Sequence, residues 1–264
     1  MYFFCVACFL PSRAGKARLG REGTNCFWCK ATARDRAMLI NIHWAFLLKL
    51  AKDPKTLPKI IGISDGSLIE KTLNRFYKSR YQNYHYHKEP KLDITKVPLS
   101  LYATADIISC SEVLEHVAPP INLAFIGLEK ILKEKGVLVM SVPHSDSHGI
   151  HIEHFPIMTA HELLHQDPPT LIGILPNGEE VQFKNLVFHG GVGFTLEYRI
   201  FSLQSIKDHL AQAGFIGAHF NRNFRSFGIV WEKWSRVWIA EKNLGLNDCS
   251  FDYKASIANQ EKIQ

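Results

Sequence analysis

Four of the six cysteines lie within the first thirty residues, arranged as two Cys-x-x-Cys pairs. Such pairs place two thiolates on one tight turn, and two turns at this separation complete the tetrahedral site of a zinc ribbon. The segment between the pairs is polar and rich in Gly and Arg, so a metal would supply stability that it lacks, on the order of 10 kcal/mol. We therefore predict one structural zinc, with free cysteines or a redox pair as the alternatives. Its ligands are Cys5, Cys8, Cys26 and Cys29.

A second group of residues that could take part in catalysis lies between residues 144 and 200, a segment rich in His, Pro and Gly. The segment is too long for a connection within a compact domain, and it directly follows an apolar strand. We expect it to form a lid that carries substrate specificity. His154 and His189 stand beside Pro156 and Gly190–Gly191, which suit a rigid or closely approached backbone. We predict both as general bases or substrate-orienting residues, the alternative being a hairpin whose histidines only stabilise it.

The most specific pattern in the chain is ADIISCSEVLEHVAPPINLAFIGLEKILKEKGVLVMSVP, residues 105–143. An apolar strand that begins at Asp106 leads into a VLEH turn, then an amphipathic helix, then a second apolar strand entered near Gly136. This order resembles the class I S-adenosylmethionine-dependent methyltransferases of the type 11 group. The resemblance covers residues 58–143 well and 200–241 more loosely.

Shorter motifs narrow the resemblance to a group of bacterial methyltransferases. These proteins carry a paired-cysteine module, an Arg-x-Arg helix start, a GxSD turn, an Asp-Ile pair, an EHFP segment, and an HGG segment followed by LE-x-R. The matching positions are Cys5–Cys29, Arg34 with Arg36, Gly62–Asp65, Asp93–Ile94, Glu153–Pro156, His189–Gly191 and Leu196–Arg199. The chain departs from the family in its cofactor loop, where only Gly66 fills a glycine position, and at Lys135, which replaces the first glycine of a Gly-Gly turn.

The resemblance implies S-adenosylmethionine as the cofactor, bound at the carboxyl edge of the sheet where open α/β sheets bind ligands. Its implied contacts are Ser64, Asp65, Gly66, Glu89, Asp93, Ser111 and Glu112. Within this set, Glu89 is a candidate for the ribose hydroxyls, unless it faces solvent, and Asp93 for the adenine amino group. A direct catalytic role is open to His116, which alternatively caps or orients the next helix.

These residues are compatible with three different functions. The first is O-methylation of a small molecule or saccharide. The second is methylation of RNA, which the basic balance and aromatic residues such as Phe27 and Trp28 would suit. The third is a non-catalytic binding protein that keeps the fold without the cofactor, as the altered glycine loop suggests. Titration with S-adenosylmethionine separates the third from the first two.

The elements that must position these residues alternate between short apolar runs and helices, which predicts an α/β fold with a doubly wound, mostly parallel sheet, Rossmann-like as in the methyltransferases. We expect a zinc-ribbon-like module over 1–33, a methyltransferase domain over 34–245 with the lid at 144–200, and a frayed tail over 246–264. Helices are predicted at 33–52, 68–76, 120–132 and 203–213, and strands at 59–64, 84–87, 105–110, 136–142, 215–220 and 236–241.

Composition excludes several classes of protein. Of 264 residues, 46% are hydrophobic and 21% charged, which is typical of a globular chain rather than a disordered one. The net charge of +6 permits an anionic partner without requiring one. We find no uncharged apolar run long enough to span a membrane and no signal peptide at Met1–Leu10, so we expect a cytoplasmic protein.

Overall fold

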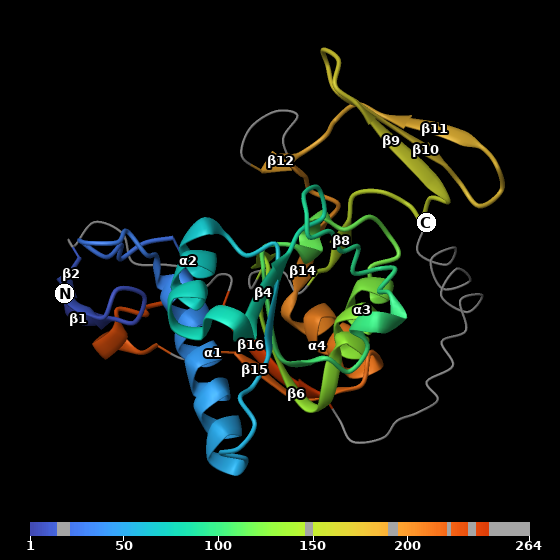
Figure 1. Cartoon of the computed structure of the whole chain (residues 1–264). Coiled ribbons are helices and arrows are strands. Elements are labelled where there is room, and N and C mark those ends of the chain that lie inside the picture. The colour runs from blue at the N-terminus through green and yellow to red at the C-terminus, as the bar shows by residue number, and fades with distance from the viewer. Residues whose placement is uncertain (15–21, 146–149, 190–194, 221–222, 232–235, 243–264) are drawn as a thin grey trace.

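A six-stranded sheet forms the centre of the molecule (Figure 1), a computed structural model that describes residues 1–14, 22–145, 150–189, 195–220, 223–231 and 236–242. The strand order is β15-β16-β6-β5-β3-β4. Four neighbouring strands run parallel, and β16 runs antiparallel to both of its neighbours. The strands are β3 (Ile60–Ile63), β4 (Tyr81–Tyr84), β5 (Ala105–Ser111), β6 (Leu132–Ser141), β15 (Phe215–Phe220) and β16 (Val237–Lys242). The predicted doubly wound, mostly parallel α/β sheet is therefore confirmed.

Helices cover both faces of this sheet. The α-helices are α1 (Ala33–Lys52), α2 (Ser67–Tyr77), α3 (Asn122–Ile131) and α4 (Leu203–Gln212), and the short 3-10 turns are η1 (Lys78–Arg80), η2 (Leu99–Leu101), η3 (Leu114–His116) and η4 (Arg225–Phe227). A capping box of Thr32 and Asp35 starts α1, and one of Ser202 and Ser205 starts α4. No helix in the described residues is both long and apolar enough to cross a membrane.

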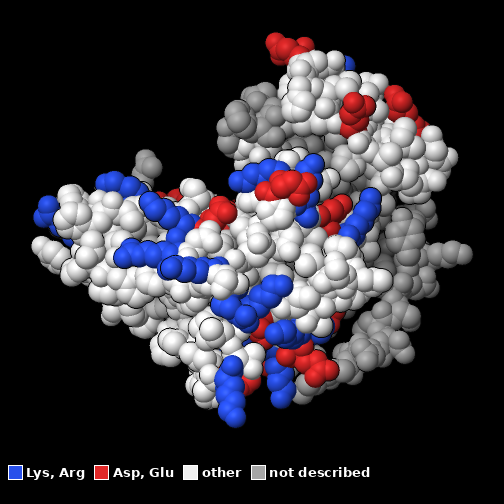
Figure 2. Space-filling model, viewed as in Figure 1, with Lys and Arg blue, Asp and Glu red and all other residues white. Residues whose placement is uncertain are grey.

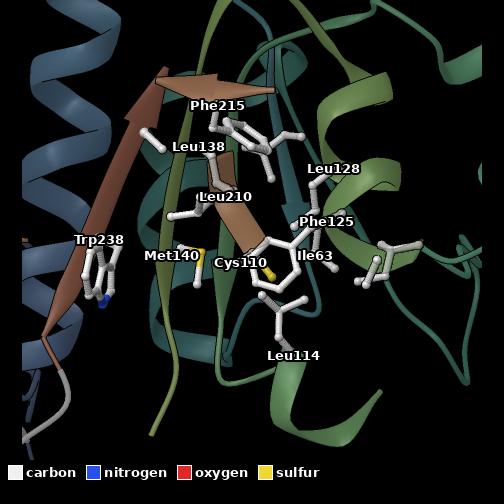
Figure 3. Packing of buried hydrophobic residues seen from close by; sticks show 14 of the residues in the cluster. Ile63, Cys110, Leu114, Phe125, Leu128, Leu138, Met140, Leu210, Phe215 and Trp238 are labelled. Carbon is white, nitrogen blue, oxygen red and sulfur yellow. The ribbon is translucent and has the colours of Figure 1, made fainter. Parts of the chain in front are cut away.

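Two apolar cores lie on opposite faces of the sheet because successive side chains of a strand point to opposite sides. Ile61 and Ile108 face α3 and α4, where Phe125, Leu128 and Leu210 complete one core (Figure 3). The neighbouring residues of β3 and β5 face α1 and α2, and their core includes Ile60, Ile107, Met38, Leu39 and Leu73. Strands buried on both faces read as continuous apolar runs, which is why residues 105–110 were recognisable in the sequence.

The N-terminal hairpin packs onto α1 instead of forming a core of its own. Strands β1 (Tyr2–Cys5) and β2 (Leu10–Arg13) pair antiparallel, and Phe3 and Cys5 join the core built on α1. Arg36, fully buried, donates hydrogen bonds to the carbonyl oxygens of Ala31, Thr24 and Gly228. This guanidinium therefore joins the cysteine-bearing loops, α1 and the segment after η4.

In its described residues, the segment between β6 and α4 contains eight short strands. They are β7 (His144–Ser145), β8 (Ile152–Glu153), β9 (Ala160–Leu164), β10 (Thr170–Ile174), β11 (Glu180–Phe183), β12 (Phe188–His189), β13 (Thr195–Leu196) and β14 (Arg199–Ser202). Strands β9, β10 and β11 form an antiparallel sheet that stands apart from the central one at the upper right of Figure 1. Strand β14 instead pairs with β7 and β8 and leads into α4.

One strand expectation is wrong. The second strand of the sheet is β4, Tyr81–Tyr84, not 84–87. Its inward side chains are Tyr81 and Asn83, whose polar atoms bond to Asp65, so the strand lacks the apolar run that would have marked it. Residues 85–90 contain a turn in which the N–H of His85 donates to the carbonyl oxygen of Pro90. The predicted tail, 246–264, and Gly190–Gly191 lie outside the described residues.

Candidate functional site

The four N-terminal cysteines form one cluster. Their sulfur atoms all lie within 4.8 Å of one another, with Cys5 Sγ 3.6 Å from Cys29 Sγ and Cys8 Sγ 3.7 Å from Cys26 Sγ. These separations fit four thiolates at about 2.3 Å from a shared zinc in tetrahedral geometry. Cys5 and Cys26 are fully buried and the other two partly so. The residues brought together are the four that the spacing predicted.

The two cysteine turns share one backbone geometry. The N–H of Phe9 donates to the carbonyl oxygen of Cys5, and the N–H of Lys30 donates to that of Cys26. Phe9 and Lys30 each follow the second cysteine of a pair and have φ values of 60° and 63°. Although burial disfavours its thiolate, hydrogen bonds from Ser12 and from backbone N–H groups lower the pKa of Cys26 to about 6. Burial instead raises the pKa of Cys5 and, to about 11, that of Cys29, so the thiolate form of those two sulfurs depends on a bound cation.

The carboxyl ends of β3 and β5 hold a second set of residues in an unusual backbone conformation. Ser64, directly after β3, has φ 53°, and Glu112, directly after β5, has φ 57°. The N–H of Ser64 donates to the carbonyl oxygen of Tyr84, and the N–H of Glu112 donates to that of Ser141. Residues other than glycine adopt positive φ at a cost of about 1–3 kcal/mol and cluster at ligand sites. Both of these neighbouring strands are therefore followed by a residue of left-handed backbone conformation, at the edge where ligands bind such sheets.

Asp65 lies beneath this edge rather than on it. It is 3% exposed, and its carboxylate accepts hydrogen bonds from Tyr81 Oη at 2.9 Å and Ser109 Oγ at 2.7 Å. Burial raises the pKa of Asp65 to about 7 despite these two donors. Gly62 makes room for the network, since a Cβ there would lie 2.4 Å from Asp65 Oδ2. Asp65 therefore supports the loop from within.

Ser111 and Glu112 face a basic residue that sequence reasoning treated only as a helix start. Arg34, in the first turn of α1, donates from Nη1 to Ser111 Oγ at 3.1 Å and lies 3.9 Å from Glu112 Oε1. Ser141 Oγ, at the end of β6, donates to Glu112 Oε1 at 2.8 Å. Three elements therefore meet at this end of the sheet, and Arg34 adds a cation to it. The Arg-x-Arg motif was the only signal in the sequence that pointed to this residue.

The other predicted cofactor contacts lie in different surroundings. Gly66 caps α2 without a side-chain hydrogen bond, and a Cβ added there would meet no atom within 4 Å. Asp93 Oδ1 accepts from the N–H and Oγ1 of Thr95, and the residue is half-buried. Glu89 is exposed on a bend beyond β4, where its carboxylate accepts the N–H of Lys91. Open space at Gly66 leaves room for a ligand over the loop, whereas Glu89 lies in a solvent-facing turn.

Two of the three predicted histidines pair with one buried carboxylate, and the third lies against one of them. Glu197, 6% exposed, lies with Oε1 3.0 Å from His154 Nε2 and with Oε2 2.6 Å from His189 Nε2. The rings of His116 and His189 are perpendicular, with centroids 4.8 Å apart. We call these three histidines with Glu197 and Glu115 the histidine cluster. It begins three residues after Glu112, at the same end of β5.

The side-chain environment sets the form of His116. Its Nδ1 lies 2.8 Å from the carbonyl oxygen of Leu196, an acceptor, so Nδ1 carries the proton and Nε2 keeps its lone pair. Burial lowers the pKa of His116, and the nearby His189 lowers it further. The imidazole is therefore neutral near pH 7, the form that accepts a proton or ligates a metal.

Arg199 fixes the turn that carries His116. It is fully buried and donates through Nη1 to the carbonyl oxygens of Leu114, at 2.7 Å, and Val117, at 2.5 Å, at the two ends of η3. Its Nε pairs with Glu153 Oε1 at 2.7 Å. The inserted segment thus contributes two of the three catalytic candidates, His154 and His189. It also contributes Arg199, the cation that holds η3.

The chain was compared with protein families, curated proteins and solved structures. A scan against protein-family models and a search of curated proteins each gave no match. Similar solved structures include a 1,6-didemethyltoxoflavin-N1-methyltransferase from Burkholderia thailandensis, 14% identical, covering 79% of each chain at a TM-score of 0.43. The sugar N-methyltransferase KedS8 from Streptoalloteichus is 11% identical over 80% of this chain and 90% of its own, at a TM-score of 0.44.

A third similar structure, the CurJ carbon methyltransferase, is 12% identical over 81% of this chain and 56% of its own, at a TM-score of 0.49. All three are methyltransferases by name, but likeness at this level assigns no activity or substrate to this chain. Fold class rests on the sheet order and on the helices that cover both of its faces.

Proposed function

We propose that the chain is an S-adenosylmethionine-dependent methyltransferase that methylates a hydroxyl group of a small molecule or saccharide. The observation that carries the proposal is the pair of left-handed residues, Ser64 and Glu112, that follow the neighbouring strands β3 and β5. Glu112 stands three residues before Glu115, so the cofactor edge and the histidine cluster share one end of β5. The resemblance of residues 105–143 to type 11 methyltransferases supports the same assignment.

The residues at the edge fit this cofactor. Open space over Gly66, the left-handed backbone at Ser64 and the half-buried carboxylate of Asp93 offer room and polar contacts for a nucleoside. Arg34, beside Ser111, pairs through Nε with Glu22 Oε1 at 2.8 Å, and the cofactor's amino-acid carboxylate would take the place of that carboxylate. When bound, S-adenosylmethionine supplies an activated methyl group, so the protein's part is alignment and proton removal.

The histidine cluster supplies the base that an acceptor hydroxyl needs. A hydroxyl must lose its proton as it attacks, and a histidine paired with a carboxylate accepts it and is stabilised as imidazolium. His154 and His189 both pair with Glu197 in this way. The inserted segment that brings them therefore acts as the acceptor lid.

Calorimetric titration with S-adenosylmethionine tests the cofactor. Wild-type protein should bind it, and Asp93→Ala should weaken binding by about 1–3 kcal/mol, the effect of losing a buried hydrogen-bond partner, which is roughly 5- to 150-fold in Kd. Asp208→Ala on the exposed side of α4 is the matched control and should leave Kd unchanged. Absence of binding by the wild type would favour the non-catalytic alternative, and an unchanged Kd in Asp93→Ala removes that residue from the site.

Kinetics of His154→Ala test the base. The variant should lower turnover roughly 100-fold or more while the affinity for S-adenosylmethionine stays near that of the wild type. His165→Ala, an exposed histidine at the end of β9, is the control. Equal turnover in His154→Ala and the control contradicts the role.

We further propose that the cysteine cluster binds one structural zinc. Four thiolates leave no coordination position for substrate, and the cluster lies in the core built on α1, so the metal stabilises the N-terminal module. Its loss should destabilise the fold around α1 without entering the reaction.

RNA as the acceptor remains a second candidate, favoured by one surface feature. Phe27 and Trp28 are 51% and 59% exposed, and Arg13 and Lys30 lie 5.8 and 5.4 Å from the Phe27 ring centroid. Exposed aromatic rings next to cations suit unstacked bases. On the face that Figure 2 shows, both basic and acidic side chains are present. Binding of single-stranded RNA that falls steeply with salt, and is lost in Trp28→Ala, would support this candidate.

A further inference from the structure

The histidine cluster contains three side chains whose ligand atoms converge. One carboxylate oxygen of Glu115 and one ring nitrogen from each of His116 and His189 all lie within 4.8 Å of one another. Glu115 is fully buried, and its Oε1 lies 3.7 Å from His116 Nε2. That separation is too long for a hydrogen bond. It is close to the roughly 3.0–3.4 Å between two ligands that each lie about 2.1 Å from a shared metal.

The surroundings of these side chains are those of a metal site. His116 bonds through Nδ1 to the carbonyl oxygen of Leu196, and His189 bonds through Nε2 to the carboxylate of Glu197. Histidines that ligate a metal with one nitrogen usually hold a carbonyl or carboxylate with the other, which fixes the ring and its tautomer. Each ring thus presents its remaining nitrogen, Nε2 of His116 and Nδ1 of His189, as the ligand.

The backbone that carries the ligands is held from both sides. The N–H of Tyr198 donates to the carbonyl oxygen of Glu115, and Arg199 holds the carbonyl oxygens at both ends of η3. These hydrogen bonds fix the backbone, so the positions of the metal-binding residues are preorganised before a metal binds, as a specific metal centre requires. From the ligand atoms and these supports, we propose that Glu115, His116 and His189 bind one divalent transition-metal ion.

Two imidazoles and one carboxylate suit borderline cations such as Zn²⁺, Fe²⁺ or Co²⁺ rather than Mg²⁺ or Ca²⁺, which prefer oxygen ligands. Three protein ligands leave at least one position open, as in catalytic metal centres. The open position would take an oxygen of the acceptor, so the substrate class is an alcohol, most readily a vicinal diol that chelates through both oxygens. Metal coordination lowers the pKa of a bound hydroxyl.

This catalytic use rests on the proposed function and divides the roles of the two histidines. His189 holds the metal, and His154, paired with Glu197, accepts the proton of the coordinated hydroxyl. The oxygen then attacks the methyl carbon of the cofactor as the carbon–sulfur bond breaks. The electron pair of that bond stays on sulfur, which becomes a neutral thioether, and the new carbon–oxygen bond forms the ether.

Cobalt titration of the full chain tests the site without cofactor or acceptor. Protein loaded with a single equivalent of zinc, which the four thiolates of the cysteine cluster bind in preference to two imidazoles and one carboxylate, should bind one further equivalent of Co²⁺. The bound ion should show visible d–d absorption without thiolate-to-cobalt charge transfer, because its ligands are nitrogen and oxygen. Glu115→Gln and His189→Gln should each weaken binding more than 100-fold, and Glu197→Gln by about 10–100-fold, because Glu197 supports a ligand without being one. His165→Gln should bind as the wild type does.

The outcomes separate this inference from the others. Wild-type protein that binds no Co²⁺ beyond the cysteine cluster overturns it, and so does undiminished binding by Glu115→Gln and His189→Gln. A thermal melt checks that each variant is folded, and the wild-type titration stands even if a variant unfolds. Since S-adenosylmethionine is absent, a failure of the methyltransferase proposal leaves the cobalt result untouched. Charge-transfer absorption as the only cobalt signal would place the ion at the cysteines and refute the second site.

Discussion

The buried carboxylate of Asp65 makes the stability of the fold depend on pH in a direction opposite to that of most aspartates. Burial raises the pKa of Asp65 from its ordinary value of 3.8 to about 7. Between these values the folded chain carries a proton at Asp65 that the unfolded chain has lost. The unfolded state then binds fewer protons, so the free energy of unfolding contributed by this group decreases as the pH rises.

The magnitude follows from the same two values. Each pH unit in this window lowers the contribution by about 1.4 kcal/mol, and about three units give a total of roughly 4 kcal/mol. The contribution is fully present below pH 3.8 and lost as the pH rises through about 7. Asp65→Asn keeps the shape of the side chain and removes the titration, so the difference in stability between wild type and variant isolates the effect.

Urea unfolding of both proteins at several pH values between 4 and 8 measures it. The wild type should lose up to about 4 kcal/mol relative to Asp65→Asn across this range. Asp208→Asn, an exposed aspartate on α4, should not reproduce the slope. A difference that stays flat, or that rises with pH, would refute the reasoning. It would mean that the donors Tyr81 and Ser109 stabilise the charged carboxylate more than burial destabilises it.

Two further predictions concern the cysteine cluster and the turn η3. Cys26→Ser combined with Cys29→Ser should lose about one zinc per chain by elemental analysis, whereas Cys110→Ala, a buried cysteine of the central core, should retain it. Arg199→Met should lower the free energy of unfolding by roughly 3–5 kcal/mol in urea, because it removes a buried cation from its carboxylate and carbonyl partners. Lys207→Met, exposed on α4, should change it little, and a loss below about 1 kcal/mol in Arg199→Met contradicts the account.

The sequence determined the layers of the fold because burial on both faces of the sheet requires uninterrupted apolar runs. Residues 105–110 and 136–142 had such runs and are strands, and the helix predicted at 33–52 is α1 at the same bounds. The cysteine cluster was also readable, because a metal site made from two local turns depends on spacing within each turn and little else.

The tertiary structure decided what polar side chains do. Strand β4 escaped recognition because its inward residues, Tyr81 and Asn83, face a buried aspartate instead of an apolar core. Asp65 was predicted to contact the cofactor. Only the tertiary structure shows that its neighbours bury the carboxylate below the edge of the sheet, which places that role in question. A residue type and its position after a strand do not fix which way its side chain turns.

The histidine cluster shows the same division. The sequence indicated His116, His154 and His189 one by one, from flanking residues and a family motif. That His154 and His189 share Glu197, and that Glu115 converges on His116 and His189, depends on how the inserted segment returns to η3. Hydrogen bonds between residues 80 and 85 positions apart hold it there. Such contacts follow no period along the chain, because each is set by the path of a loop through space rather than by the repeat of a helix or strand.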